Sequence, residues 1–284
     1  MNKIGIIGNG FVGNAIHQGL KNHFDVLVYD LNPEKKINTF VELQEASLIF
    51  VSVPTPMTQD GNFDLSMVKD VAGRFIQSKL LVIKSTITPS AAEDLVNKYP
   101  MHTFVFNPEF LTERTAVEDF HNPSRIVLGS DSEQALDVVE EMYRTVFPDP
   151  LIQIIKTDTK TACFIKYFSN CFFAAKVALM NEFRQASDAA GIDWNTALTG
   201  LITSGWVNPM HTLVPGPDGD YGFGGKCFPK DINAFMSYCR ELGVDPKMLK
   251  AAWNKNLEVR KNSDWLHIDG AVSKKGEKNE LQTF

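Results

Sequence analysis

The chain has 284 residues, of which 44% are hydrophobic and 22% charged, and its formal net charge at pH 7 is −6. This composition supplies enough apolar material for the core of one large domain or two modest ones. The acidic balance, with lysines spread along the chain, argues against a nucleic-acid partner.

No segment indicates a membrane span or an oxidising compartment. No apolar run approaches the ~18 residues of a membrane span, and the first residues lead directly into a strand, so we expect no membrane partner and no leader. The four cysteines, at 163, 171, 227 and 239, form neither a C-x-x-C pair nor the framework of a small secreted domain. We therefore expect reduced thiols, a cytoplasmic protein and no bound metal.

The first predicted elements are a strand, a glycine turn and a helix. An apolar run at 3–7 precedes Gly8-Asn9-Gly10-Phe11-Val12-Gly13, and a helical pattern follows. A second strand, 25–29, ends in Asp30, close to the ~20-residue spacing of an acid that binds ribose hydroxyls. We interpret this as a dinucleotide turn that favours NAD, because a carboxylate repels a 2′-phosphate. An ordinary tight turn is the alternative, and the nearby Lys35 and Lys36 leave the cofactor preference open.

Further buried strands are predicted at 48–53, 80–84, 103–106 and 125–129. They indicate an α/β fold, a Rossmann-like doubly wound parallel sheet followed by a mostly helical domain with a long spine helix. In such sheets the ligand lies beyond the carboxyl ends of the strands, so we expect Thr55 and Thr86 to contact the cofactor. Helix capping by Thr86 and Thr88 is the alternative. Glu109 and Glu113 also follow a strand, where a solvated surface turn is the simpler interpretation.

One long helical pattern is predicted from 158 to 190, with apolar residues recurring at three and four. Lys166 and Asn170, four residues apart, share a face of this helix, although such a lysine can also extend to solvent. A helical region at 194–206 and a last helix at 248–266 follow. The predicted domains are 1–156, NAD-binding, 157–267, helical and dimerising, and 268–284, a polar and disordered tail.

The stretch from Tyr221 to Asp231 contains three glycines, one cysteine, two lysines and a carboxylate. We expect the glycines, at 222, 224 and 225, to adopt positive φ and to let the backbone approach a ligand closely. Pro229 suits the first turn of a helix, so Cys227 is predicted just ahead of a helix start with cationic neighbours. Such surroundings favour a reactive thiolate, and the alternative is a buried structural cysteine.

These motifs resemble those of the UDP-glucose/GDP-mannose dehydrogenase family. The most specific are Gly-Gly-Lys-Cys-Phe-Pro-Lys-Asp at 224–231 and Asn-Pro-Glu-Phe-Leu at 107–111, and the likeness covers nearly all of 1–267. The resemblance implies a catalytic set of Cys227, Lys166, Asn170, Asp231, Glu109 and Thr86. It implies an NAD site lined by Gly8, Gly10, Phe11, Val12, Gly13, Asp30, Lys35, Thr55, Thr86, Glu113 and Lys230. It implies a nucleotide-sugar site lined by Glu109, Phe110, Leu111, Thr112, Glu113, Lys166, Asn170, Gly216, Pro217, Asp218, Gly219, Asp220 and Gly224.

The same resemblance implies an NAD-dependent, four-electron oxidation of the carbon-6 alcohol of a nucleotide sugar, through a thiohemiacetal and a thioester on Cys227. UDP-glucose is the expected substrate, giving UDP-glucuronate, and GDP-mannose is the alternative. Lys166 and Asn170 would hold the reacting oxygen, Asp231 would assist acid–base steps, and Glu109 would lie near the hydrolytic water. We also expect a homodimer, because the long aromatic helix offers more apolar surface than the helical region can bury.

Two departures from the family pattern are visible. The further C-terminal domain usual in the family has no counterpart in this sequence. The run Asn208-Pro209-Met210-His211-Thr212 stands where relatives carry Asp-Pro-Arg-Ile-Gly, so His211 would be a partial substitute for an arginine expected at the substrate. Two other functions stay open: a β-hydroxyacid-type dehydrogenase, which transfers one hydride and needs no nucleophilic cysteine, and a non-catalytic sensor of NAD or nucleotide sugars.

Overall fold

The computed structural model of the protein describes residues 3–58 and 61–273. The chain divides into two compact units. Unit 1 comprises Met1–Thr55 and Asp64–Lys166, and unit 2 comprises Pro56–Phe63 and Tyr167–Phe284. The boundary therefore lies inside the long helix rather than at residue 156, and a short segment of the N-terminal half belongs to unit 2.

Unit 1 is built on a seven-stranded sheet with the order β2-β1-β3-β4-β5-β6-β7. Strands β1 to β5 are parallel, β6 pairs antiparallel with β5, and β7 is parallel to β6. The predicted α/β fold is thus confirmed, with a mixed, mostly parallel sheet. The strand order reverses between β1 and β3, which is where such sheets bind ligands. The strands are β1 (Lys3–Ile7), β2 (Asp25–Tyr29), β3 (Leu48–Val51), β4 (Leu80–Ile83), β5 (Thr103–Phe106), β6 (Arg125–Gly129) and β7 (Gln153–Thr157).

The strands differ in how clearly their sequences predict them. All four residues of β3 are buried, because a central strand covered on both faces is apolar along its length. Strand β7 was not predicted from the sequence. Its sequence, Gln-Ile-Ile-Lys-Thr, has polar residues at both ends and no fully buried position, as befits the edge of the sheet.

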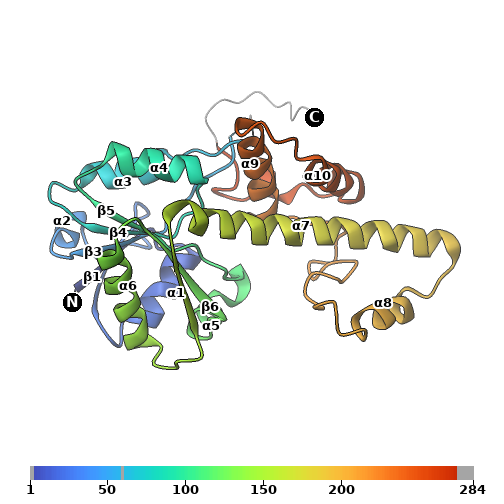
Figure 1. The fold of residues 1–284 in the computed structure, drawn as a ribbon, viewed down its shortest axis with the longest axis horizontal. Coiled ribbons are helices and arrows are strands. Elements are labelled where there is room, and N and C mark those ends of the chain that lie inside the picture. The colour runs from blue at the N-terminus through green and yellow to red at the C-terminus, as the bar shows by residue number, and fades with distance from the viewer. Residues whose placement is uncertain (1–2, 59–60, 274–284) are drawn as a thin grey trace. The chain divides into compact units, whose positions relative to one another are not determined.

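Helices cover both faces of this sheet, with α3 and α4 on one side and α1, α5 and α6 on the other (Figure 1). The core on the second side joins Ile16, Phe120 and Val139 of these helices to strand residues such as Phe50 and Val105. The helices of unit 1 are α1 (Phe11–Leu20), α2 (Phe40–Leu43), α3 (Ser66–Arg74), α4 (Pro89–Lys98), the 3₁₀ turn η1 (Glu113–Thr115), α5 (Ala116–His121) and α6 (Glu133–Val146).

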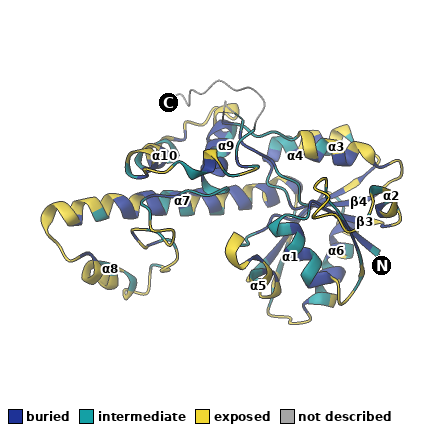
Figure 2. Ribbon diagram, turned by 180° about the vertical axis from the view of Figure 1, so that it is seen from behind, coloured by how far each residue is buried: buried dark blue, intermediate teal, exposed yellow. Residues whose placement is uncertain are grey.

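Helix α7 (Thr159–Ala190) has 32 residues and contains the boundary between the units. It begins where Asp158 accepts a hydrogen bond from the Thr161 N–H at 2.9 Å. Its length and composition would allow it to cross a membrane, which for a single helix is weak evidence of a membrane span, and 50% of its most apolar stretch is buried inside the structure. Figure 2 shows buried and exposed residues along its whole length. Phe172, Leu179 and Phe183 form an exposed stripe, because their spacings of seven and four keep them on one face.

Unit 2 packs α9 (Phe228–Glu241) and α10 (Lys247–Val259) with its part of α7, and Ile232, Met236 and Trp253 lie in the shared core. Asp193 caps α8 (Trp194–Ile202), which ends earlier than predicted, before Gly205 with φ of +77°. The last predicted helix, 248–266, is interrupted after α10 and resumes as a 3₁₀ turn, η2 (Asp264–Leu266).

Residues 268–273 belong to the packed part of unit 2. Ala271 is 1% exposed, and its carbonyl accepts a hydrogen bond from the Met57 N–H at 2.8 Å. The Ser273 N–H donates in turn to the Met57 carbonyl at 2.7 Å. The polar tail predicted from 268 therefore does not begin at that residue, and 274–284 lie outside the described residues.

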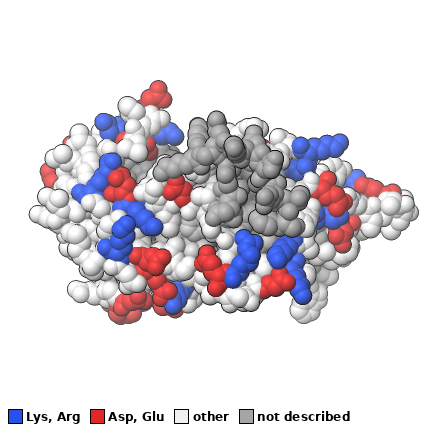
Figure 3. All heavy atoms as spheres, turned by 90° about the horizontal axis from the view of Figure 1, so that it is seen from above, with Lys and Arg blue, Asp and Glu red and all other residues white. Residues whose placement is uncertain are grey.

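Charged side chains of both signs are interspersed on the face drawn in Figure 3. Several surface charges are paired, as where Lys156 lies within 3.3 Å of Glu133, Asp137 and Glu140. Such mixing gives this face little of the single-sign field that attracts an extended polyanion.

Candidate active site

The glycine turn between β1 and α1 has the geometry of a dinucleotide turn. Gly8 has a φ of +90°, and a Cβ there would lie 2.7 Å from the Ser52 carbonyl oxygen. A Cβ at Gly13 would overlap the Gly8 carbonyl oxygen, whereas the space around Gly10 is open. Gly10 is the N-cap of α1 and no side chain caps this helix end. Its first N–H groups can therefore bind a phosphate.

Asp30 follows β2 beside this turn, with its carboxylate held in place. It accepts hydrogen bonds from the N–H groups of Asn9 at 2.6 Å and Asn32 at 2.8 Å. Oδ1 of Asn9 is buried and has no hydrogen-bond partner in the described part of the chain, while its Nδ2 donates to the Lys35 carbonyl at 2.8 Å. An unsatisfied acceptor beside a fixed carboxylate suits a ligand that brings hydroxyl donors, as the ribose of NAD does.

The threonines beyond β3 and β4 have distinct roles. Thr55 is 5% exposed, and its hydroxyl donates to the Thr86 carbonyl at 2.9 Å, which ties the two strand ends together. Helix α4 is capped by Thr88, whose hydroxyl accepts from the Ala91 N–H. The capping alternative thus applies to Thr88, and Thr86 stays at the carboxyl edge of the sheet.

Glu109 and Lys166 form a buried ion pair within unit 1. They are 7% and 4% exposed, and Lys166 Nζ lies 3.1 Å from Glu109 Oε1. The same ammonium donates to the Glu109 carbonyl at 2.7 Å, and Glu109 Oε2 accepts from the Leu111 N–H at 2.6 Å. This geometry disagrees with both simpler interpretations from the sequence, a solvated Glu109 and a Lys166 side chain that extends to solvent. Both charges are fixed where water does not screen them.

The rest of the predicted substrate segment near Glu109 is less buried. The Phe110 ring lies 5.5 Å from Lys166 Nζ and 4.1 Å from the guanidinium carbon of Arg125, so it contributes cation–π contacts. Thr112 and Glu113 are exposed, the latter in η1. Of the two glutamates predicted near this strand end, the structure buries only Glu109 among charged partners.

Among the four cysteines, Cys227 differs from the others in exposure. Cys163, Cys171 and Cys239 are buried, and burial raises the pKa of each thiol above its ordinary value. Cys227 is partly exposed and is the N-cap of α9, with Pro229 in the first turn as predicted. A thiol at a helix N-terminus is better placed to react than three thiols sealed in apolar surroundings.

A buried polar cluster occupies the first turn of α9. Asp231, 1% exposed, accepts hydrogen bonds from Lys230 Nζ at 2.6 Å and from Asn170 Nδ2 at 2.6 Å. The Asp231 N–H donates to the Cys227 carbonyl at 2.8 Å. Lys230, which we expect at the cofactor, forms an ion pair with its neighbour Asp231. The structure thus brings Asn170, Lys230 and Asp231 together one helical turn from Cys227.

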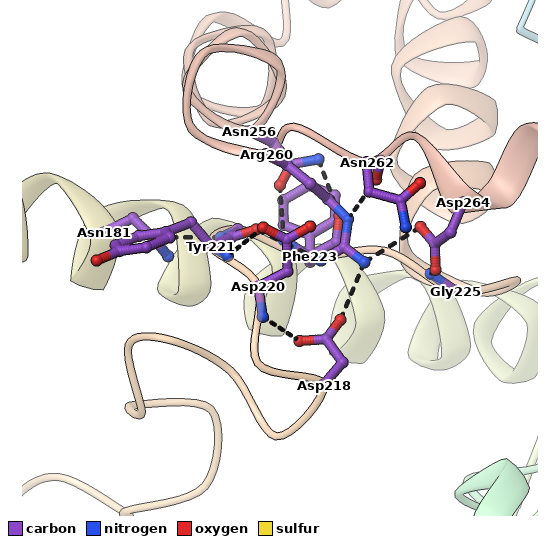
Figure 4. A network of polar contacts seen from close by, with 11 residues as sticks. Asn181, Asp218, Asp220, Tyr221, Phe223, Gly225, Asn256, Arg260, Asn262 and Asp264 are labelled. Atoms are coloured by element: carbon purple, nitrogen blue, oxygen red, sulfur yellow. Dashed lines mark hydrogen bonds and ion pairs between the residues drawn. The ribbon is translucent and has the colours of Figure 1, made fainter.

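The glycine loop before Cys227 is held by Arg260 (Figure 4). The guanidinium of Arg260, 7% exposed as a residue, donates to Asp218 Oδ2 at 2.9 Å and to the Tyr221 carbonyl at 3.4 Å. Asp264 Oδ2 accepts from the Gly225 N–H at 3.0 Å. No local sequence pattern predicts this role of Arg260, because its loop partners lie about 40 residues earlier in the chain.

The glycines of this loop serve different purposes. Gly222 and Gly225 have φ of +67° and +73°, as predicted. Gly224 is not among the positive-φ residues, and a Cβ there would overlap the Arg260 guanidinium and the Asp264 carboxylate. For Gly224 the expectation is therefore corrected: glycine is required by close packing against this chain's own side chains.

His211 adopts a φ of +65°, which is uncommon for a residue with a Cβ. Its ring stacks on Phe173 at 4.6 Å and lies 5.4 Å from Phe228. Burial, and then the charge of Lys176, lower the pKa of His211. A neutral ring packed between aromatic residues is a poor replacement for an arginine, so packing is the better description of His211.

The fold and these clusters define an NAD-binding α/β protein with a second, helical unit that carries a helix-capping thiol. The NAD-binding domain of the UDP-glucose/GDP-mannose dehydrogenase family matches residues 36–147, and the central domain of that family matches residues 160–258. The chain belongs to this family.

Relatives and solved structures agree with that assignment. UDP-glucose 6-dehydrogenase of Rickettsia bellii is 35% identical over 225 residues, which are 76% of this chain and 50% of that protein. The chain thus spans about half the length of the curated relatives it matches. A UDP-glucose dehydrogenase structure from Pyrobaculum islandicum has a TM-score of 0.80 at 26% identity, over 91% of this chain and 68% of that one. A Mycobacterium tuberculosis 3-hydroxyisobutyrate dehydrogenase shares the fold, with a TM-score of 0.70 at 17% identity, over 91% and 93% of the two chains.

Proposed function

We propose that the protein oxidises the carbon-6 alcohol of a nucleotide sugar to the carboxylic acid, with UDP-glucose as substrate and UDP-glucuronate as product. The observation that carries the proposal is the position of Cys227, a partly exposed N-cap thiol one helical turn from buried Asp231, Lys230 and Asn170. Family membership and relatives named UDP-glucose 6-dehydrogenase support the choice of substrate class.

The chemistry divides between two oxidations and one hydrolysis. The carbon-6 hydroxyl loses its proton to a base and its carbon loses a hydride, which leaves an aldehyde. The Cys227 thiolate adds to the aldehyde carbon, and the oxygen takes up a proton to give a thiohemiacetal. Loss of that proton and of a second hydride gives a thioester. Water then adds, the carbon–sulfur bond breaks, and the acid leaves with the thiol restored. NAD supplies the hydride acceptor for both oxidations.

Buried charged and polar side chains of this chain have separate tasks in the proposal. Lys166 and Asn170 donate to the sugar oxygen as negative charge develops on it. Asp231, fixed by Lys230 and Asn170, handles protons beside Cys227. Glu109, fixed by Lys166 and the Leu111 N–H, orients the hydrolytic water.

The proposal includes a homodimer formed through α7. Phe172, Leu179 and Phe183 are 60%, 50% and 53% exposed along one face of this helix. An apolar stripe of this kind is typical of an interface between copies of a chain. The mass measured by sedimentation at micromolar concentration tests it, and an active monomer would contradict it.

The experiment compares NADH formed with sugar consumed, for UDP-glucose and GDP-mannose, in the wild type and in Cys227 variants. Two NADH per UDP-glucose are expected. Cys227→Ser should begin hydride transfer and stall as an ester adduct visible in the intact mass, while Cys227→Ala should form no adduct. Cys239→Ala is the matched control, since Cys239 lies buried on the same helix.

Several outcomes would contradict the proposal. If Cys227→Ala kept the four-electron oxidation within about tenfold of wild type, Cys227 would not be the nucleophile. One NADH per substrate would favour the β-hydroxyacid-type dehydrogenase, whose fold this chain shares. Binding of NAD and nucleotide sugar without turnover would favour the sensor.

A further inference from the structure

Lys84 is a buried lysine at the carboxyl end of β4 that the proposed chemistry does not use. It is 7% exposed, and it follows Ile83 directly, just before Ser85 and Thr86 at the ligand edge of the sheet. Among the described residues its ammonium has one hydrogen-bond acceptor, Asn107 Oδ1 at 3.1 Å. A buried ammonium usually has a carboxylate or several carbonyls around it, so this position is unusual.

Asn107 connects Lys84 to the segment that carries Glu109. The same Oδ1 accepts from the Tyr143 hydroxyl at 2.5 Å, and Nδ2 donates to the Val127 carbonyl at 2.8 Å. Asn107 is 1% exposed, so β4, α6 and β6 together fix the residue two positions before Glu109. Movement of Lys84 or loss of its charge would therefore be felt at Glu109 through the backbone.

Electrostatics couple Lys84 to the same pair. The charged groups that act on it are Glu109, which favours the ammonium, and Lys166, which opposes it. Tyr143 also faces Asn107, but burial raises the pKa of its hydroxyl, which stays protonated. Glu109 and Lys166 already form an ion pair, so an ionised Lys84 adds a second ammonium group beside that pair.

We infer that Lys84 is a positioning residue for the Glu109–Lys166 pair, which its ammonium orients through Asn107 and to which it adds a buried positive charge. This inference rests on the proposed function, in which negative charge develops on a substrate oxygen held by Lys166. A fixed positive charge in a dry site stabilises such charge without touching it. Lys84 contributes no atom to the reaction.

The position of Lys84 also predicts how its effect depends on pH. Burial is the main cause that lowers the pKa of Lys84 from 10.5 to about 8. The charge is therefore present at pH 7 and is lost as the pH rises through 8. A neutral Lys84 resembles methionine in shape and charge, so wild type and Lys84→Met should become alike at high pH.

The test measures kcat and KM from pH 7 to 9.5 for wild type, Lys84→Met and Lys79→Met. Lys79 is the matched control because it is 6% exposed at the opposite end of the same strand, where its ammonium donates to the carbonyls of Gln44 and Ala46. We expect Lys84→Met to lower kcat at pH 7 by about tenfold, with KM for both substrates within about twofold, and the kcat ratio to approach one by pH 9.5. Lys79→Met should lower the melting temperature but leave kcat unchanged at every pH.

Each result decides the inference. The inference is overturned if kcat of wild type exceeds that of Lys84→Met by less than threefold at pH 7, or if this kcat ratio does not change with pH. An equal loss of kcat in Lys79→Met also overturns it. If the wild type oxidises no nucleotide sugar, the proposed function has failed instead. Lys84→Arg separates the effect of charge from that of shape, because arginine stays charged at every pH in the range. With the kcat of each enzyme expressed relative to its own value at pH 7, the kcat of wild type should fall above pH 8 and that of Lys84→Arg should not.

Discussion

Each unit contains a buried lysine–carboxylate pair, and the two pairs differ in what surrounds them. In unit 2 Lys230 and Asp231 are joined by the neutral amide of Asn170, at the N-terminus of the helix that Cys227 caps. In unit 1 Glu109 and Lys166 are accompanied by a further ammonium, that of Lys84. The first arrangement pairs opposite charges beside the thiol that we propose as the nucleophile. The second adds a further positive charge to the pair, which in the proposed reaction would stabilise an oxyanion.

This difference should appear most strongly when each carboxylate is replaced by its amide. Glu109→Gln removes a carboxylate that faces two ammonium groups, those of Lys84 and Lys166, whereas Asp231→Asn removes one that faces the ammonium of Lys230. Removing one partner of a buried pair costs about 3–5 kcal/mol, so we expect Glu109→Gln at ~5 kcal/mol and Asp231→Asn at ~3 kcal/mol. Urea unfolding monitored by circular dichroism measures both.

A double substitution sharpens that comparison. Adding Lys84→Met to Glu109→Gln removes one of the two ammonium groups that faced the lost carboxylate, so about 1–2 kcal/mol of the loss should be recovered. Adding Lys84→Met to Asp231→Asn should recover nothing, because those residues belong to different clusters. Equal recovery in both backgrounds would show that Lys84 acts on the whole fold rather than on Glu109.

Local sequence patterns predicted the parts of both sites that depend on short stretches of chain. The glycine turn with Asp30, and the helix start after Cys227, follow from residues within a few positions of one another or from a fixed strand–turn–helix spacing. Lys84 and Tyr143 were not predicted, because they meet at Asn107 only once β4, β5 and α6 are in register. A lysine directly after the apolar run Leu80–Ile83 is the one signal that the sequence offered.

Arg260 and Gly224 show the same limit in unit 2. A glycine-rich loop before a cysteine suggests that the backbone comes close to a ligand there. At Gly224, however, the close neighbour is the side chain of Arg260, which is distant from the loop along the chain. Strand β7 was missed for a different reason, since an edge strand with polar ends lacks the apolar run that identifies β3. At Gly224 the deciding contact is made by a residue distant in sequence, whereas at β7 the local apolar signal is weak.

The free energy of unfolding should depend on pH through the titration of Lys84. The expected change is smaller than the loss in Glu109→Gln and larger than that in Tyr143→Phe. Its pKa is 10.5 as an ordinary lysine and about 8 in the folded protein, because burial disfavours the ammonium. Between these values the unfolded chain binds more protons, so the free energy of unfolding rises with pH. Relative to Lys84→Met, the wild type should gain ~2 kcal/mol between pH 7 and 9.5. The other titrating groups cancel in this difference, and a flat difference would show that Lys84 is not a buried ammonium.

The smallest effect is expected at Tyr143, the other group that fixes Asn107. Tyr143→Phe removes the hydroxyl that donates to Asn107 Oδ1 at 2.5 Å but leaves that oxygen bonded to Lys84. The loss of one buried hydrogen bond whose acceptor stays satisfied costs about 1 kcal/mol of unfolding free energy. Because no charge changes, kcat should fall by less than about threefold, and the ratio to wild type should stay constant from pH 7 to 9.5. A pH-dependent ratio in this variant would mean that the orientation of Asn107, rather than the charge of Lys84, links this network to Glu109.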